Sequence, residues 1–119
     1  MTTFAWLVIG HLVGDWVAQN DWMAKGKRRS LMNLPGLAHF AVYTASVLGA
    51  GWLSGLQGRP LAWYVPLGAA VFLSHWLIDG TRLVNLWMRV ARQSDLDTVQ
   101  LMVDQTLHLL GLAVVAALV

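Results

Sequence analysis

The sequence contains no cysteine and no glutamate, and only 12% of its 119 residues are charged. The absence of cysteine excludes disulfide bonds and removes the thiolate ligands that zinc or copper(I) often takes in proteins. Soluble domains carry about 25% charged residues, so a chain this poor in charge is unlike a soluble protein. Nucleic acid is also an unsuitable partner, because the net charge is only +2 and no base-stacking motif accompanies the basic residues.

Apolar residues make up 57% of the chain, and its seven tryptophans suit aromatic belts at the two surfaces of a membrane. A helix crosses a bilayer in about 20 residues, and four apolar segments approach or reach that length. The sequence therefore predicts an all-α membrane protein, a single domain over residues 1–119 with a bundle of four transmembrane helices. The expected helices cover about residues 3–19, 34–55, 64–81 and 98–119, with an amphipathic interfacial segment at about 82–93.

Local signals refine these boundaries. Asn33 and Pro35 predict the start of the second helix, and Pro66 falls in the first turn of the third, where proline is tolerated. Gly10 and Gly14 form a Gly-x-x-x-Gly ridge, which either allows a second helix to approach closely or is incidental spacing. The candidate caps of the last helix are Ser94, Asp95 and Asp97.

Basic residues are concentrated in two of the three expected loops. Four Lys or Arg residues lie between residues 20 and 33 and three between 82 and 93, whereas the loop between them carries only Arg59. Because cytoplasmic loops are rich in Lys and Arg, both termini are expected outside the cytoplasm. The amphipathic segment suits a surface of anionic lipid head groups. The residues expected to attract head-group phosphates are Lys25, Lys27, Arg28 and Arg82.

All four histidines and three of the six aspartates lie inside the apolar segments. Six of these residues form pairs with four-residue spacing, which places both members of a pair on one face of a helix. With 1.5 Å of rise per residue, all seven lie roughly 5–15 Å inside the expected cytoplasmic boundary, in one layer. The pairs are His11 and Asp15, His75 and Asp79, and Asp104 and His108, and the single histidine is His39.

Three interpretations of this layer are open. An aspartate at the centre of a membrane helix costs roughly 2.5–3.5 kcal/mol, so buried His and Asp side chains can serve simply to satisfy one another and hold the bundle together. Intramembrane His and Asp are also the usual groups of proton or ion pathways. The interpretation that we favour is a divalent transition-metal site for Zn, Mn or Fe, because neutral imidazole and carboxylate suit these ions.

Seven candidate ligands exceed the needs of one tetrahedral ion and suit one or two ions, with an aspartate as the bridge between a pair. Paired ions lie about 3.5–4 Å apart and promote phosphoester hydrolysis, so the sequence predicts a metal-dependent hydrolase of a lipid-linked phosphoester. The rival functions are an ion or proton carrier and a structural or interaction subunit. Gln19 and Gln105 flank the ligands and are expected to hydrogen-bond to them. So small a bundle buries little surface, which favours a homo-oligomer or a membrane partner protein.

The polar motifs occur in a distinctive order along the chain. They are Gly-His11-Leu-Val-Gly-Asp15-Trp-Val-Ala-Gln19, Lys25-x-Lys27-Arg28, His39, Ser-His75-Trp-Leu-Ile-Asp79 and Asp104-Gln105-x-x-His108. This order resembles a family of small bacterial and phage membrane proteins, domain of unknown function 3307, over nearly the whole chain. The resemblance implies a location in the bacterial inner membrane and brings no activity with it. The His-x-x-x-Asp motifs on membrane helices are also similar to those of inner-membrane metal-dependent hydrolases. This second similarity is limited to the motif itself.

Overall fold

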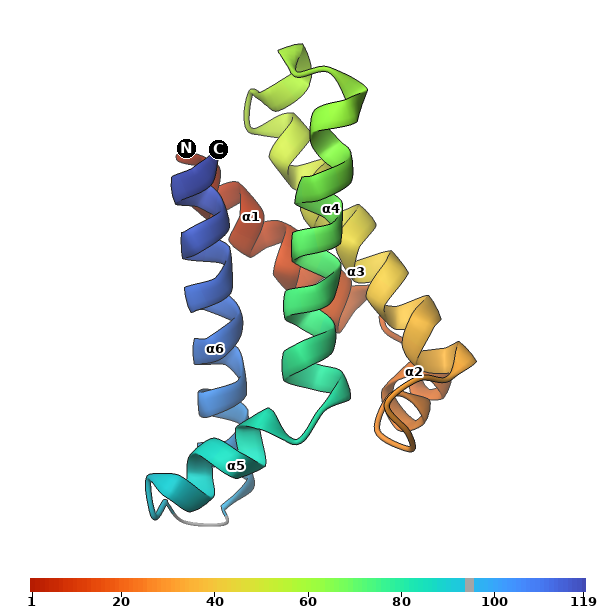
Figure 1. Cartoon of the computed structure of the whole chain (residues 1–119), viewed down its shortest axis with the longest axis vertical. Helices are drawn as coiled ribbons and strands as arrows, with labels where there is room; N and C mark the ends of the chain where they lie inside the picture. Colours follow the sequence, from red (N-terminus) through yellow and green to blue (C-terminus); the bar gives the residue numbers. More distant parts are fainter. Residues whose placement is uncertain (94–95) are drawn as a thin grey trace.

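The computed structural model describes residues 1–93 and 96–119, and within those residues it contains helices and their connections but no strand (Figure 1). The all-α prediction is therefore confirmed. The α-helices are α1 (Thr3–Leu12), α2 (Asp21–Gly26), α3 (Leu34–Leu53), α4 (Leu61–His75), α5 (Leu83–Val90) and α6 (Asp97–Leu118). Single π-helical turns prolong α1 and α4, and these are η1 (Val13–Val17) and η3 (Trp76–Gly80), while the 3-10 turn η2 (Leu56–Gly58) leads from α3 to α4.

Three helical stretches are long and apolar enough to cross a membrane, Leu34–Leu53, Leu61–Gly80 and Asp97–Leu118. The N-terminal stretch, Thr3–Val17, is apolar but shorter. It ends two residues before the predicted boundary because Asn20 caps a new helix, accepting a hydrogen bond from the backbone N–H of Met23 at 3.0 Å. That helix, α2, lies in the basic segment for which no helix was predicted.

The connection between α3 and α4 also differs in detail from the prediction. α3 ends at Leu53, and Gly55 then adopts a left-handed conformation with φ of 115°, which glycine tolerates and which stops the helix. α4 begins at Leu61, three residues before its predicted start, so Pro66 lies inside the helix and not in its first turn. Asn33 caps α3 as predicted, accepting from the N–H of Gly36 at 2.7 Å.

The amphipathic segment predicted at residues 82–93 forms the shorter helix α5, which is followed by α6. Asp97 is the first residue of α6, and the apolar residue Leu96 occupies the N-cap position, so the prediction of Asp97 as the cap is wrong. A carboxylate in the first turn still interacts favourably with the helix dipole. The other two candidate caps, Ser94 and Asp95, lie outside the described residues.

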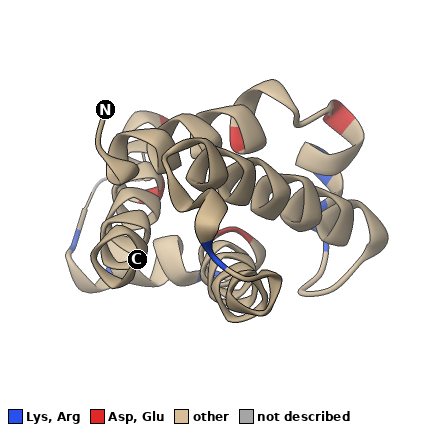
Figure 2. Cartoon of the chain, turned by 90° about the horizontal axis from the view of Figure 1, so that it is seen from above, with Lys and Arg blue, Asp and Glu red and all other residues tan. Residues whose placement is uncertain are grey.

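The long helices alternate in direction along the chain. Both termini lie at one end of the molecule with the connection between α3 and α4, while α2 and α5 lie at the opposite end (Figure 1). Seen from above, charged residues occupy only short stretches of ribbon and most of each long helix is uncharged (Figure 2). Many large apolar side chains on these helices are exposed in the isolated chain, among them Leu73, Leu110 and Val114. Apolar surface of this kind is typical of a molecule that contacts lipid or a partner.

The glycine ridge of α1 and η1 faces α3. A Cβ atom added at Gly10 would lie 2.8 Å from the backbone oxygen of Ser46 and 2.9 Å from the Cα of Val47. At Gly14 the added atom would lie 2.8 Å from the Cα of Tyr43. Backbone atoms do not move aside as flexible side chains can, so the ridge is a surface for close helix packing and the spacing is not incidental.

Replacing Gly10 with leucine is therefore expected to destabilise the fold. Overpacking a tight contact costs about 1–3 kcal/mol, which thermal unfolding in detergent micelles would detect. Gly49→Leu is the matched control, because a Cβ added at Gly49 meets no atom within 4 Å. Equal destabilisation of the two variants would contradict the assignment of Gly10 to a packing surface.

Candidate metal site

The two π-helical turns carry two of the aspartates. Asp15 lies in η1 and Asp79 lies in η3. A π turn closes i→i+5 hydrogen bonds, so it shifts the residues within it around the helix axis, and such turns occur frequently at functional sites. The shift matters here because Asp15 contacts partners on other helices that His11, one turn earlier, does not reach.

Four side chains from four helical segments meet in the interior, and we call them the four-residue group. One potential ligand atom from each lies within 4.8 Å of the others. The Nε2 atom of His39 is 3.4 Å from Asp15 Oδ1 and 2.8 Å from the Nε2 atom of His75. Imidazole nitrogen and carboxylate oxygen at this separation can surround a single cation. The members of the group are Asp15, His39, His75 and Asp79.

A second cluster, the three-residue group, shares Asp79 with the first and adds Asp104 and His108 from α6. His108 donates its Nδ1 hydrogen to the backbone oxygen of Asp104 at 2.9 Å, which leaves Nε2 facing Asp79 Oδ1 at 3.4 Å. Asp79 directs its other oxygen, Oδ2, into the four-residue group, 3.6 Å from His75 Nε2. Its two oxygens therefore point into different groups, which is the arrangement of a bridging carboxylate.

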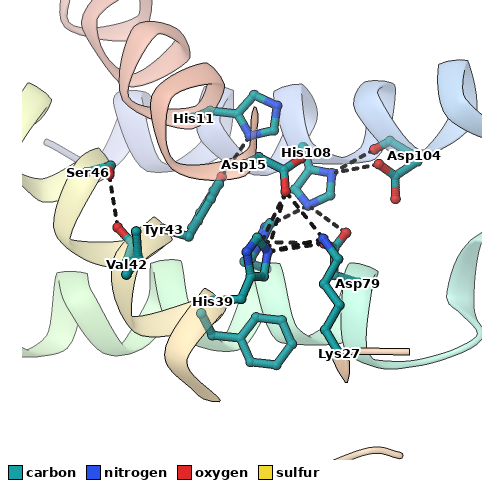
Figure 3. Close-up of polar contacts among 12 residues, drawn as sticks. His11, Asp15, Lys27, His39, Val42, Tyr43, Ser46, Asp79, Asp104 and His108 are labelled. Carbon is teal, nitrogen blue, oxygen red and sulfur yellow. Dashed lines mark hydrogen bonds and ion pairs between the residues drawn. The ribbon is translucent and has the colours of Figure 1, made fainter. Parts of the chain in front are cut away.

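Lys27 does not lie where the sequence led us to expect it. The side chain is only 7% exposed, and its ammonium group forms an ion pair with Asp79 Oδ2 inside the four-residue group (Figure 3). The Nζ atom is also 3.2 Å from His39 Nε2 and 3.5 Å from Asp15 Oδ1. Lys27 is therefore buried beside the candidate ligands and is not an exposed basic side chain, because the turn after α2 directs it inward.

His11 belongs to neither group. Its Nδ1 atom is 3.2 Å from the hydroxyl of Tyr43, and its Nε2 atom is 3.0 Å from Gln105 Oε1. Gln105 in turn donates from Nε2 to Asp104 at 3.1 Å and to Asp15 at 3.5 Å. His11 thus helps to orient Gln105. Gln105 hydrogen-bonds to the candidate ligands Asp15 and Asp104, as predicted from the sequence.

Tyr43 is a site residue that the sequence analysis missed. Its ring stacks on the imidazole of His75 with a centroid distance of 3.5 Å and an interplanar angle of 4°. Tyr43 lies one helical turn after His39, so its position on the same face of α3 was the available signal.

Two buried polar atoms of the four-residue group have no hydrogen-bond partner. They are Asp15 Oδ1, whose neighbours lie at ion-pair distances only, and His39 Nδ1. A buried acceptor left without a hydrogen bond costs about 1–3 kcal/mol. A cation close to Asp15 Oδ1 would reduce that cost. The imidazole nitrogens and carboxylate oxygens of the two groups also suit a divalent ion with a preference for nitrogen and oxygen ligands.

A cavity of about 1070 Å³ connects these groups to the end of the molecule that carries α2 and α5. Asp15, Asp79 and Asp104 line it together with Gln19, whose Oε1 atom is buried without a hydrogen-bond partner. Exposed arginines also line the cavity, and these are Arg28, Arg29 and Arg82. Lys25 takes no part, since it is exposed and pairs with Asp21 at 3.3 Å.

On the side away from the cavity, an apolar cluster covers the polar groups. Leu7 lies one turn before His11 and Val71 one turn before His75, so both belong to the half of the molecule that holds the termini. The cluster is completely or almost completely buried. Its members are Leu7, Tyr43, Val47, Val71, Leu112 and Val115.

Comparisons with curated proteins and with solved structures found no match. The family described as "Protein of unknown function (DUF3307)" matches the chain over residues 3–119. That range includes α1 to α6 and every residue of both candidate ligand groups. The chain therefore belongs to the DUF3307 family.

Proposed function

We propose that the chain spans the bacterial inner membrane four times, with Thr3–Val17 as a short first span and both termini outside the cytoplasm. Three longer apolar stretches support this arrangement. The basic segments around α2 and α5 lie at the same end of the molecule, as a common cytoplasmic face requires (Figure 1). On this orientation the cavity opens toward the cytoplasm and the apolar cluster lies toward the outer surface.

Single introduced cysteines test the orientation. The natural chain contains no cysteine, so no other position adds background labelling. Ser30→Cys and Gln93→Cys are expected to be protected from an impermeant thiol reagent in intact cells, and Gln57→Cys is expected to be labelled. All three positions are exposed and uncharged, so the loop charges that determine orientation stay intact. The reverse labelling pattern would place the cavity on the outer side.

We propose further that the two groups bind one or two divalent metal ions, with Zn, Mn or Fe as candidates, and that the protein hydrolyses a lipid-linked phosphoester. The observation that carries this proposal is the cavity, which joins cationic side chains to buried carboxylates and imidazoles. Arg28 and Arg82 are suited to bind the phosphate of a head group through bidentate hydrogen bonds. The acyl chains of such a substrate would remain in the surrounding leaflet.

The chain's own residues have separate tasks in this proposal. Asp79 faces the Lys27 ammonium with one oxygen and His108 with the other, so it would hold a divalent ion between the two groups, and Gln105 orients Asp15 and Asp104 through hydrogen bonds. A bound divalent ion supplies Lewis-acid activation of water and of a phosphoryl oxygen. Tyr43, stacked on His75, holds that imidazole in place and excludes water from its face.

A proton or ion carrier is the second candidate, and a specific arrangement favours it. The imidazoles of His39, His75 and His108 form a continuous chain, with nitrogen–nitrogen distances of 2.8 Å and 2.7 Å. Tyr43, a member of the apolar cluster, stacks on His75 in the middle of this chain. A dry apolar layer opposes ion passage, so we rank hydrolysis above transport.

Purified protein tests these alternatives directly. We expect stoichiometric transition metal in protein prepared without chelator, and release of phosphate or a phosphorylated head group from lipids in proteoliposomes. Ion flux without chemical turnover would refute the hydrolase proposal and support the carrier proposal. Protein that binds no metal and shows neither activity would leave a structural subunit with a hydrogen-bonded polar interior.

A further inference from the structure

Lys27 occupies the position that a cation would take in the four-residue group. We infer that its ammonium group replaces one of two metal ions, so that the protein binds one divalent ion, in the three-residue group of Asp79, Asp104 and His108. This inference rests on the proposed metal-binding function and specifies the stoichiometry and the place of the ion.

The contacts of the ammonium group are those expected of a bound cation. Its Nζ atom contacts Asp79 Oδ2, Asp15 Oδ1 and His39 Nε2, three of the four potential ligand atoms of that group. A zinc ion would bind the same atoms at about 2.0–2.2 Å. An ion at that place and the Nζ atom of Lys27 would overlap, so they exclude one another.

The backbone that carries Lys27 is held firmly. The N–H of Lys27 donates to the Met23 oxygen at 2.9 Å and completes α2. The preceding residue, Gly26, lies against Pro35 so closely that an added Cβ would be 2.3 Å from the Pro35 Cβ. Asn33 donates from Nδ2 to the Gly26 oxygen at 2.6 Å. These contacts fix the turn against the start of α3, with the lysine side chain buried beneath it.

The balance of charge also favours one ion. Asp15, Asp79 and Asp104 together carry three negative charges, while one ammonium and one divalent ion carry three positive charges. Two divalent ions without Lys27 would leave a net positive charge, and Lys27 alone leaves two negative charges unbalanced. The side chains of Asp15 and Asp79 are only 7% and 6% exposed, and unbalanced charge is costly at such positions, so the combination of Lys27 and one ion is preferred.

Asp79 becomes the common anchor of both cations in this arrangement. Its Oδ2 atom holds the ammonium and its Oδ1 atom faces the three-residue group. Lys27, Asp79 and Asp104 all line the same cavity, so a phosphate entering it would meet both cations.

The test compares metal content in the natural protein and in Lys27→Met, which has a similar length and no charge. After saturation with Mn²⁺ and removal of excess, we expect one ion per chain in the natural protein and two in the variant. Paired Mn²⁺ ions about 3.5–4 Å apart give an exchange-coupled electron paramagnetic resonance signal, which only the variant should show. Lys25→Met is the matched control from the exposed face of α2 and should bind one ion.

Removal of Lys27 leaves Asp79 without its ion pair, so the variant is expected to melt at a lower temperature in chelator and to recover when Mn²⁺ is added. Lys27→Gln, which retains hydrogen bonding, serves if Lys27→Met does not fold. Two coupled ions in the natural protein, or one ion in a folded Lys27 variant, would overturn the inference and leave metal binding intact. No ion in the natural protein would overturn both the inference and the proposed function.

Discussion

Replacing Asp79 with asparagine is expected to remove both bound metal and lipid turnover. Asp79 is the only residue shared by the two ligand groups of the described chain, and each of its oxygens faces a different group. Loss of a residue that hydrogen-bonds to a metal ligand lowers metal affinity about 10–100-fold, so loss of the ligand itself should lower the affinity by about 100-fold or more. Isothermal titration of chelator-treated protein measures this change.

The same substitution removes the nearer of the two carboxylate partners of the buried Lys27 ammonium and leaves only Asp15, at 3.5 Å, and breaking a buried ion pair costs about 3–5 kcal/mol. Circular dichroism must therefore show that the variant is folded. Asp97→Asn is the matched control, because Asp97 lines the same cavity but belongs to neither group. Normal metal affinity in folded Asp79→Asn, or equal losses in both variants, would refute the assignment of Asp79 as the shared ligand.

Arg82→Ala is expected to weaken substrate binding much more than it slows the chemical step. Hydrogen bonds to charged groups contribute about 1.5–3 kcal/mol, which corresponds to an increase in KM of roughly 10- to 160-fold. If the phosphate is bound equally in the ground state and the transition state, kcat stays nearly constant. Steady-state kinetics in proteoliposomes with varied lipid fraction separates the two constants.

Arg89→Ala provides the comparison for Arg82→Ala. Arg89 lies on α5 and is exposed, but it does not line the cavity. A general electrostatic attraction of lipid to the basic surface would raise KM in both variants, whereas a specific phosphate contact would raise it in Arg82→Ala alone. A fall in kcat with unchanged KM would assign Arg82 to the transition state and not to head-group binding.

Helical periodicity and depth predicted six of the polar residues that come together in the two groups. His75 and Asp79 share a face at four-residue spacing, and alternating helix directions bring His39 and His108 to a similar depth. These regularities come from backbone geometry alone, so they can be deduced from a single sequence. They do not determine which atom faces which, because that depends on rotations of a few tens of degrees around each helix.

The packing of neighbouring helices is the main reason why the detailed contacts could not be predicted. The pair of His11 and Asp15 has the same spacing as His75 and Asp79, yet His11 contacts Tyr43 and Gln105 and belongs to neither ligand group. Both aspartates lie in π turns, so the difference between the pairs comes from the neighbouring helices: His11 contacts Tyr43 and Gln105, whereas His75 contacts His39 and His108. Spacing along one helix contains no information about its neighbours, so the sequence presented the two pairs as equivalent.

Lys27 was assigned to the surface for a related reason. A lysine in a segment rich in basic residues is usually solvated, and its neighbours Lys25 and Arg28 are indeed exposed. Its inward direction depends on α2 and on the contact between Gly26 and Pro35. Both are tertiary features, and no periodic pattern in the sequence represents them.

The apolar cluster above the polar groups has an electrical consequence on the proposed orientation. Moving one charge through the whole membrane potential changes its energy by about 2.3 kcal/mol per 100 mV. The cavity brings water to the polar groups from one side, so most of the voltage falls across the dry layer formed by Leu7, Val47 and Val71. A divalent ion would reach its ligands without crossing most of that field, and its occupancy would follow the cytoplasmic ion concentration whatever the membrane voltage.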